Sequence, residues 1–128
     1  MAPEPETSAF AKTPAPPYYA VIFASLRREG DGGYAEMANR MRALALRQPG
    51  CLGADSARNA DGFGLTIAYF ATEAELLAWK NHADHLLAQR LGQTRWYEHY
   101  EVRVAKVERA YSGPQGRDLV GTPPAVKD

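Results

Sequence analysis

The chain has 128 residues with 15 basic and 15 acidic side chains, so its formal net charge is zero. This length predicts one domain, and the charge balance excludes a basic surface of the kind that attracts nucleic acid. The single cysteine, Cys51, has no partner for an internal disulfide. No stretch reaches the roughly 18 apolar residues of a membrane span, and the N-terminus does not have the pattern of a signal peptide. We therefore expect a cytoplasmic protein that binds neither nucleic acid nor membrane.

Proline marks the limits of the predicted folded region. Five of the nine prolines precede Tyr18, and three follow Tyr111. The segments at both ends also have no periodic apolar face. We predict a disordered N-terminal tail over residues 1–17, a folded domain over 18–111 and a flexible C-terminal tail over 112–128.

The folded region begins with a predicted strand and a predicted helix. Residues 18–26 (YYAVIFASL) form a short apolar run rich in aromatic and β-branched side chains, which is typical of a strand. Over residues 34–47 apolar side chains recur every three or four positions, which predicts a helix with one buried face. Pro49 and Gly50 then end that helix.

A β-hairpin is predicted next. Residues 51–58 and 63–71 both have the composition of strands. The Asp61-Gly62 pair between them favours a tight turn, so the two strands should run antiparallel.

A second helix and a last strand complete the predicted domain. Thr72 and Glu75 have the spacing of a capping box, which predicts the start of a helix that ends near Gly92. The inner face of this helix holds Leu76, Trp79, Ala83, Leu86 and Leu87. Residues 99–109 alternate as a strand. The order β-α-β-β-α-β predicts an α+β, ferredoxin-like fold, in which a four-stranded antiparallel sheet carries both helices on one face.

The first strand is apolar on both of its faces, whereas two helices can cover only one face of the sheet. One face holds Tyr19, Val21 and Phe23, and the other holds Tyr18, Ala20, Ile22 and Ala24. Strands that are apolar on both sides are usually buried on both sides. A small domain also gains stability from association. We therefore predict a homodimer that packs through the sheet face.

Three stretches carry a resemblance to a known family: YYAVIFASL, QPGCLGADSARNADGFGLTIAYFATEAELLAWKNH and AQRLGQTRWYEHYEVRVAKVER. In the PG before a strand, the hairpin leading into a helix with AWK, and the RWY run before the last strand, residues 18–110 resemble the antibiotic biosynthesis monooxygenase family. The resemblance implies a dimeric α+β barrel with a pocket between each sheet and its own helices. Characterised members of the family oxidise polycyclic aromatic precursors or degrade haem.

The chain departs from two patterns found in that family. The haem-degrading pattern has an Asn on the first strand, a Trp on the second helix and a His ten residues further on. Trp79 matches the Trp, but Gln89 stands in place of the His and residues 18–28 contain no Asn. An imidazole ligand for haem iron is therefore missing from this pattern. The polyketide-oxidising pattern has an Asn one helical turn before the Trp, where this chain has Glu75.

Four residues are predicted to be catalytic: Trp79, His82, Arg95 and Tyr97. Trp79 either packs as a core aromatic or stacks on a flat substrate with its indole N–H directed at a carbonyl. His82 lies on the flank of the same helical face, and imidazole is the usual side chain for proton transfer near neutral pH, which makes His82 the candidate acid or base. Arg95 is either a solvated charge or, with Tyr97, holds an enolate or phenolate oxygen.

Phe63, Tyr69 and Trp96 are predicted to bind substrate, because they can add aromatic surface to the same cavity. For Trp96 the alternative is packing under the end of the second helix. His82 and His85 lie three residues apart without a third ligand, so no metal site is predicted. The sequence also has no phosphate-binding loop and no nucleophile elbow.

The residues and the resemblance together predict a monooxygenase that needs no cofactor and oxidises a small aromatic or quinol-type substrate with O₂. A deprotonated, electron-rich substrate can supply the electrons itself, so the protein need only bind the ring, stabilise the anion and exclude water. Two alternatives stay open. One is a non-catalytic small-molecule-binding or stress-response protein with the same barrel, and the other is a haem-degrading monooxygenase.

Overall fold

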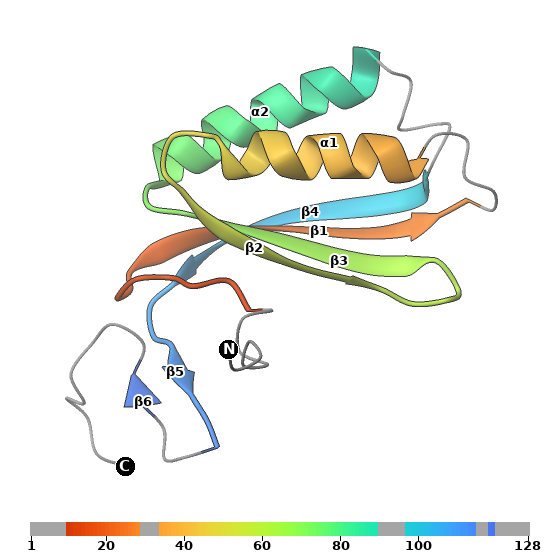
Figure 1. The fold of residues 1–128 in the computed structure, drawn as a ribbon. Coiled ribbons are helices and arrows are strands. Elements are labelled where there is room, and N and C mark those ends of the chain that lie inside the picture. Colours follow the sequence, from red (N-terminus) through yellow and green to blue (C-terminus); the bar gives the residue numbers. More distant parts are fainter. Residues whose placement is uncertain (1–9, 29–33, 90–96, 115–117, 120–128) are drawn as a thin grey trace, which may run out of the picture.

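The fold is seen in a computed structural model that describes residues 10–28, 34–89, 97–114 and 118–119 (Figure 1). Its elements are β1 (Tyr18–Arg27), α1 (Tyr34–Leu46), β2 (Cys51–Arg58), β3 (Phe63–Phe70), α2 (Glu73–Gln89), β4 (Tyr97–Val107), β5 (Tyr111–Ser112) and β6 (Asp118–Leu119). Within the described residues no helix is long and apolar enough to cross a membrane.

The main sheet has four strands in the order β2-β3-β1-β4, and every neighbouring pair is antiparallel. Both α1 and α2 cover the same face of this sheet (Figure 1). This arrangement confirms the predicted α+β, ferredoxin-like fold. The predicted hairpin turn is also confirmed, with Gly62 at a φ of +101° that a side chain would rarely adopt.

The core lies between the helices and one face of the sheet. Phe70 on β3 and Leu76 on α2 are completely buried, and Trp79 is 7% exposed. Val21 on β1 and Ala45 on α1 belong to the same buried cluster. The helical face predicted from the spacing of Leu76 and Trp79 is therefore the face that packs on the sheet.

Thr72 caps the N-terminus of α2. Its Oγ1 accepts a hydrogen bond from the backbone N–H of Glu75 at 3.1 Å and donates one to the Glu75 carboxylate at 3.0 Å. The Glu75 carboxylate also lies directly over Gly50, where a Cβ atom would collide with it. Gly50 has a φ of +80°, so the glycine after Pro49 is required by both backbone conformation and space.

The face of the sheet away from the helices, called the open face below, changes in burial along β1. Tyr18 and Ala20 at one end are each 4% exposed, whereas Leu26 at the other end is 36% exposed. Phe63 and Leu65 on β3 pair with β1 near Leu26 and are 44% and 40% exposed. The open face is therefore closed near Tyr18 and exposed near Leu26. Its exposed side chains there are apolar on β1 and β3, and on β4 they are His99, Glu101 and Arg103.

Residues 10–17, called the N-terminal segment below, lie on the closed end of the open face. The backbone N–H of Ala11 donates a 2.7 Å hydrogen bond to Asp55 on β2, and the Thr13 hydroxyl donates a 2.9 Å hydrogen bond to Tyr18. Ala11 also packs on Gly53, whose missing side chain makes room for it. Part of the predicted disordered tail is thus held on the sheet. It is held by backbone and polar contacts, which leave no apolar periodicity in the sequence.

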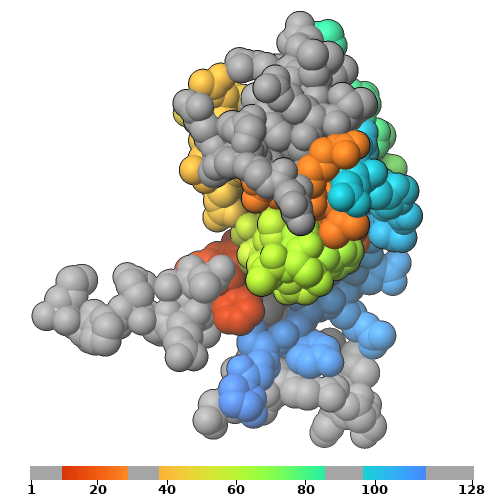
Figure 2. Space-filling view, turned by 90° about the vertical axis from the view of Figure 1, so that its right-hand side faces the viewer, coloured from red at the N-terminus to blue at the C-terminus, as the bar shows by residue number. Residues whose placement is uncertain are grey.

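After β4, the short strand β5 pairs antiparallel with β6 and forms a separate two-stranded sheet. Figure 2, which looks along the strands, shows the blue residues after β4 below the sheet and the yellow α1 above it. The red N-terminal segment is on the lower side as well. The described residues before β1 and after β4 therefore lie on the side of the sheet opposite the helices.

Candidate functional site

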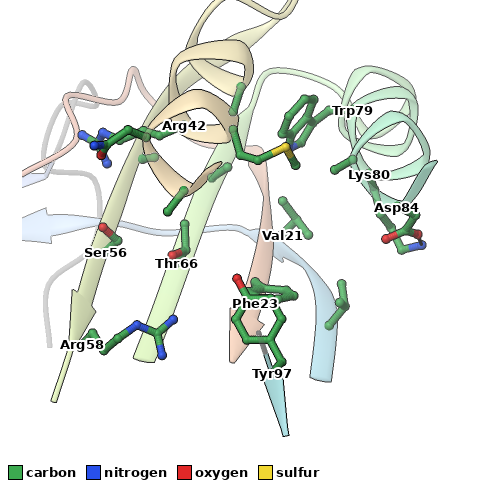
Figure 3. Close-up of a pocket in the computed structure, with 18 of the residues that line it drawn as sticks. Val21, Phe23, Arg42, Ser56, Arg58, Thr66, Trp79, Lys80, Asp84 and Tyr97 are labelled. Atoms are coloured by element: carbon green, nitrogen blue, oxygen red, sulfur yellow. Dashed lines mark hydrogen bonds and ion pairs between the residues drawn. The ribbon is translucent and has the colours of Figure 1, made fainter. Parts of the chain in front are cut away.

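A cavity of about 330 Å³ lies between the sheet and the two helices (Figure 3). Val21 and Ala68 form part of its floor, and the small residues that the two helices contribute are Ala38, Ala45 and Ala83. Because these helical positions carry only methyl groups, the helices stand over the sheet without filling the space between them. The volume is at the lower end of the range for small-molecule sites.

One side of the cavity is built from aromatic side chains, namely Phe23, Trp79 and Tyr97, and is called the aromatic side. The rings of Phe23 and Tyr97 meet edge to face with centroids 5.4 Å apart, and Tyr97 is 8% exposed. Tyr100 completes this cluster at 5.3 Å from Phe23. Such packing fixes the ring planes of Phe23 and Tyr97, so the aromatic side is suited to a flat apolar ligand.

The opposite side of the cavity is polar and is called the basic side. It consists of Arg42 from α1, Ser56 and Arg58 from β2, and Thr66 from β3 (Figure 3). Ser56 and Thr66 are paired across the two strands, so their hydroxyl groups are neighbours on the cavity floor. Both residues remain exposed although they are on the helix-covered face, which means that the cavity opens here.

Arg58 is oriented by two groups of the β1 and hairpin region. Its guanidinium donates a 2.9 Å hydrogen bond to the Ser25 hydroxyl and another to the Gly62 carbonyl oxygen. Ser25 is only 2% exposed, so this pairing satisfies a buried hydroxyl. Gly64 lies directly under the guanidinium, since a Cβ added there would be 2.7 Å from Arg58 Cζ. Sequence reasoning missed Arg58, and the available signal was the glycine opposite it in the hairpin.

At the α2 end of the cavity, Lys80 and Asp84 form an ion pair with Nζ and Oδ2 3.1 Å apart. Their spacing of four residues on one helix allows this contact. Both side chains line the cavity, and 47% of the Asp84 side chain is exposed. Asp84 is the acidic residue in the described cavity lining.

Two of the predicted catalytic residues, Trp79 and Tyr97, come together in this cavity. His82 is exposed and is not among the described lining residues, although its ring is 5.9 Å from that of Trp79. Arg95 and the predicted substrate-binding residue Trp96 lie outside the described residues. The described residues contain no group of three or more His, Cys, Asp or Glu side chains that could hold a metal ion.

Phe63 and Tyr69 do not share the cavity with Trp79, and this prediction is wrong. Phe70 and Ala68 on β3 point to the helices, so strand alternation places Phe63 and Tyr69 on the open face. There the Tyr69 hydroxyl donates a 2.9 Å hydrogen bond to Asp55. Burial, followed by this bond to the carboxylate, raises the pKa of Tyr69 to about 12.

Comparison with known sequences supports the classification that fold and cavity suggest. Residues 17–91 match the family described as antibiotic biosynthesis monooxygenase, so the chain belongs to that family. It is also 52% identical over 99 residues to the uncharacterized protein YqjZ of Bacillus subtilis (strain 168). That match covers 77% of this chain and 87% of the relative.

Solved structures share the fold at much lower sequence identity. A candidate antibiotic biosynthesis monooxygenase from Nitrosomonas europaea superposes with a TM-score of 0.57 at 16% identity, over 70% of this chain and 89% of the other. PA3566 from Pseudomonas aeruginosa gives a TM-score of 0.55 at 18% identity, over 73% and 95% of the two chains. These similarities confirm the architecture and say nothing about the substrate.

Proposed function

We propose that the protein is a cofactor-independent monooxygenase that oxidises a small aromatic or quinol-type substrate with O₂ in the cavity beside Trp79. The observation that carries this proposal is the aromatic side, since Phe23, Trp79 and Tyr97 offer ring surface for a flat ligand. Membership of the family supports the class of reaction. A cytoplasmic location, as expected from the sequence, belongs to the same proposal.

The proposed reaction draws its electrons from the substrate. Removal of a proton from an anthrone-like carbon leaves a carbanion, which passes one electron to O₂ and then combines with the resulting superoxide. The peroxide anion formed in this way takes up the proton, and the resulting hydroperoxide loses water to leave the carbonyl group. Overall, a CH₂ group and O₂ become a C=O group and H₂O. The protein must therefore hold the ring, accept a proton and stabilise a transient oxyanion.

The cavity lining offers a group for each of these tasks. Trp79 and Phe23 would hold the ring, while the Tyr97 hydroxyl and the Trp79 indole N–H would donate to the substrate oxygen. Asp84 is the carboxylate that would accept the proton, and its ion pair with Lys80 holds it at the α2 end of the cavity. His82, close to Trp79 and exposed, would pass the proton on to solvent.

Oxygen uptake tests the proposal directly. Purified protein should accelerate O₂ consumption by an anthrone or a dihydroxynaphthalene above the rate with heat-denatured protein. Trp79→Phe should lower kcat, because it keeps much of the packing and removes the N–H donor. Trp79→Ala is less informative, since truncating a core aromatic costs about 3–5 kcal/mol of stability. Leu77→Ala is the matched control, because Leu77 lies on the same helix but is exposed and outside the cavity lining.

Two outcomes would contradict the proposal. If Trp79→Phe and Asp84→Asn both oxidise as fast as the unaltered protein, the reaction does not take place in this cavity. If the unaltered protein is inert with a broad panel of phenols and quinols but still binds them, the small-molecule-binding function replaces the enzyme.

A further inference from the structure

The two sides of the cavity differ in charge as well as in aromatic content. In Figure 3 the basic side lies under α1 and beside β2, and the aromatic side lies between β1, β4 and α2. The acidic residue of the described lining, Asp84, belongs to the α2 end and is paired with Lys80. Positive charge on the basic side is therefore not met by an acidic group from the described lining on that side.

Arg42 is the residue on which this difference depends most. Its side chain is exposed, lines the cavity and leaves α1 on the side away from Trp79 (Figure 3). It has no hydrogen-bond or ion-pair partner among the described residues. A guanidinium at a cavity mouth retains its five N–H donors for a ligand and matches a carboxylate in shape.

The floor below Arg42 adds donors that suit the same group. Ser56 and Thr66 present neighbouring hydroxyls, and neither makes a side-chain hydrogen bond to another described residue. Arg58 brings a second guanidinium, held in one orientation by Ser25 and the Gly62 carbonyl. Two guanidinium groups and two hydroxyls, at the end of the cavity away from the Lys80–Asp84 pair, form a site for an anion.

We infer that the substrate of this cavity is an aromatic carboxylate, with its ring against the aromatic side and its carboxylate on the basic side between Arg42, Ser56 and Thr66. This inference rests on the proposed use of the cavity as the substrate site, and it specifies which aromatic compounds the site selects. It also fixes the direction in which the ligand lies, with its far ring toward Tyr97 and Trp79.

Calorimetric titration with two ligands of similar shape tests the inference without any oxidation. The protein should bind 2-naphthoate about tenfold more tightly than the neutral 2-acetonaphthone, because only the carboxylate makes charge-assisted hydrogen bonds. Arg42→Met should remove most of this preference, because it should weaken 2-naphthoate binding much more than 2-acetonaphthone binding. Arg40→Met is the matched control, since Arg40 is exposed on the same helix but does not line the cavity.

Charge reversal gives a second, independent measurement. Arg42→Glu should weaken 2-naphthoate binding further and favour the cationic 2-(aminomethyl)naphthalene. Equal binding of 2-naphthoate and 2-acetonaphthone, or an equal effect of Arg40→Met and Arg42→Met, would overturn the inference and leave the proposed oxygenase standing. A clear preference for 2-naphthoate without any oxygen uptake would support the inference and contradict the oxygenase. Failure to bind any of the three ligands would overturn both.

Discussion

Gly64 and Arg58 face each other across β2 and β3, and the absence of a side chain at Gly64 is what lets the guanidinium lie flat on the strand. Arg58 is in turn the donor that satisfies the buried Ser25 hydroxyl. A substitution at either position should therefore disturb the hydrogen bond between Arg58 and the Ser25 hydroxyl, so the two positions are energetically coupled.

This coupling gives a prediction. Gly64→Ala should lower the free energy of unfolding by about 1–2 kcal/mol, because the displaced guanidinium leaves a buried hydroxyl without its partner. In an Arg58→Met background the same substitution should cost much less, since there is no guanidinium left to displace. Denaturant unfolding of the two single variants and the double variant measures the coupling. Strictly additive effects would show that the two positions are independent.

Tyr69 gives a prediction about pH. Its pKa in the folded protein is about 12, and an unfolded tyrosine titrates near 10, so folding favours the protonated phenol. The resulting stabilisation is fully present below pH 10 and is lost as the pH rises toward 12. The melting temperature of the unaltered protein should fall more steeply over this interval than that of Tyr69→Phe, which cannot ionise. Parallel pH profiles would show that Tyr69 ionises with the same pKa in both states.

For individual residues, the sequence predicted the burial of Trp79 but not the set of side chains that line the cavity. The apolar residues around Leu76 and Trp79 recur every three or four positions and fall on a single helical face, so the buried face of α2 could be predicted. Phe63 and Tyr69 were assigned to the cavity because alternation shows which residues share a face, not which face the helices cover. When a strand is apolar on both faces, composition does not resolve that choice.

Among the elements, α2 depends on its first turn, where Thr72 and Glu75 satisfy each other's hydrogen-bonding groups. Thr72→Ala should lower the stability to unfolding by about 1 kcal/mol, which is the usual cost of losing a capping side chain. Thr72→Ser keeps the hydroxyl and should cost only a few tenths of that amount. Equal losses for the two variants in thermal unfolding would show that the Thr72 methyl group, and not the cap, is responsible.

The element boundaries could be predicted closely wherever a local chemical signal exists. Cys51–Arg58 was predicted to the residue, because Pro49-Gly50 precedes it and the Asp61-Gly62 turn follows it. β4 starts at Tyr97, two residues before the predicted start, at a point where no such signal separates it from the preceding residues. The hydrogen bond between the N-terminal segment and Asp55 could not be predicted either. A backbone N–H that bonds to a carboxylate far away in the chain produces no pattern in the local sequence.

For the whole molecule, the exposed apolar end of the open face supports the predicted homodimer. Light scattering at micromolar concentration should give about twice the 14.1 kDa mass of the chain. Leu65→Glu should produce the monomer, because it places a charge beside the exposed side chains of Leu26 and Phe63. Leu46→Glu is the control, since Leu46 is 43% exposed but lies at the end of α1. A monomeric unaltered protein would contradict the dimer.

The N-terminal segment also restricts how two copies can be related. Near Tyr18 and Asp55 the open face is already occupied by the chain's own residues 10–17, so the contact area left for a second copy is at the end near Leu26 and Phe63. A two-fold axis relating the copies would therefore pass off-centre, displaced toward the β2–β3 turn and not through the middle of the sheet. Such an offset would bring the hairpin ends of the two copies together. Removing the N-terminal segment would free the central position for the axis and create a choice between two assemblies.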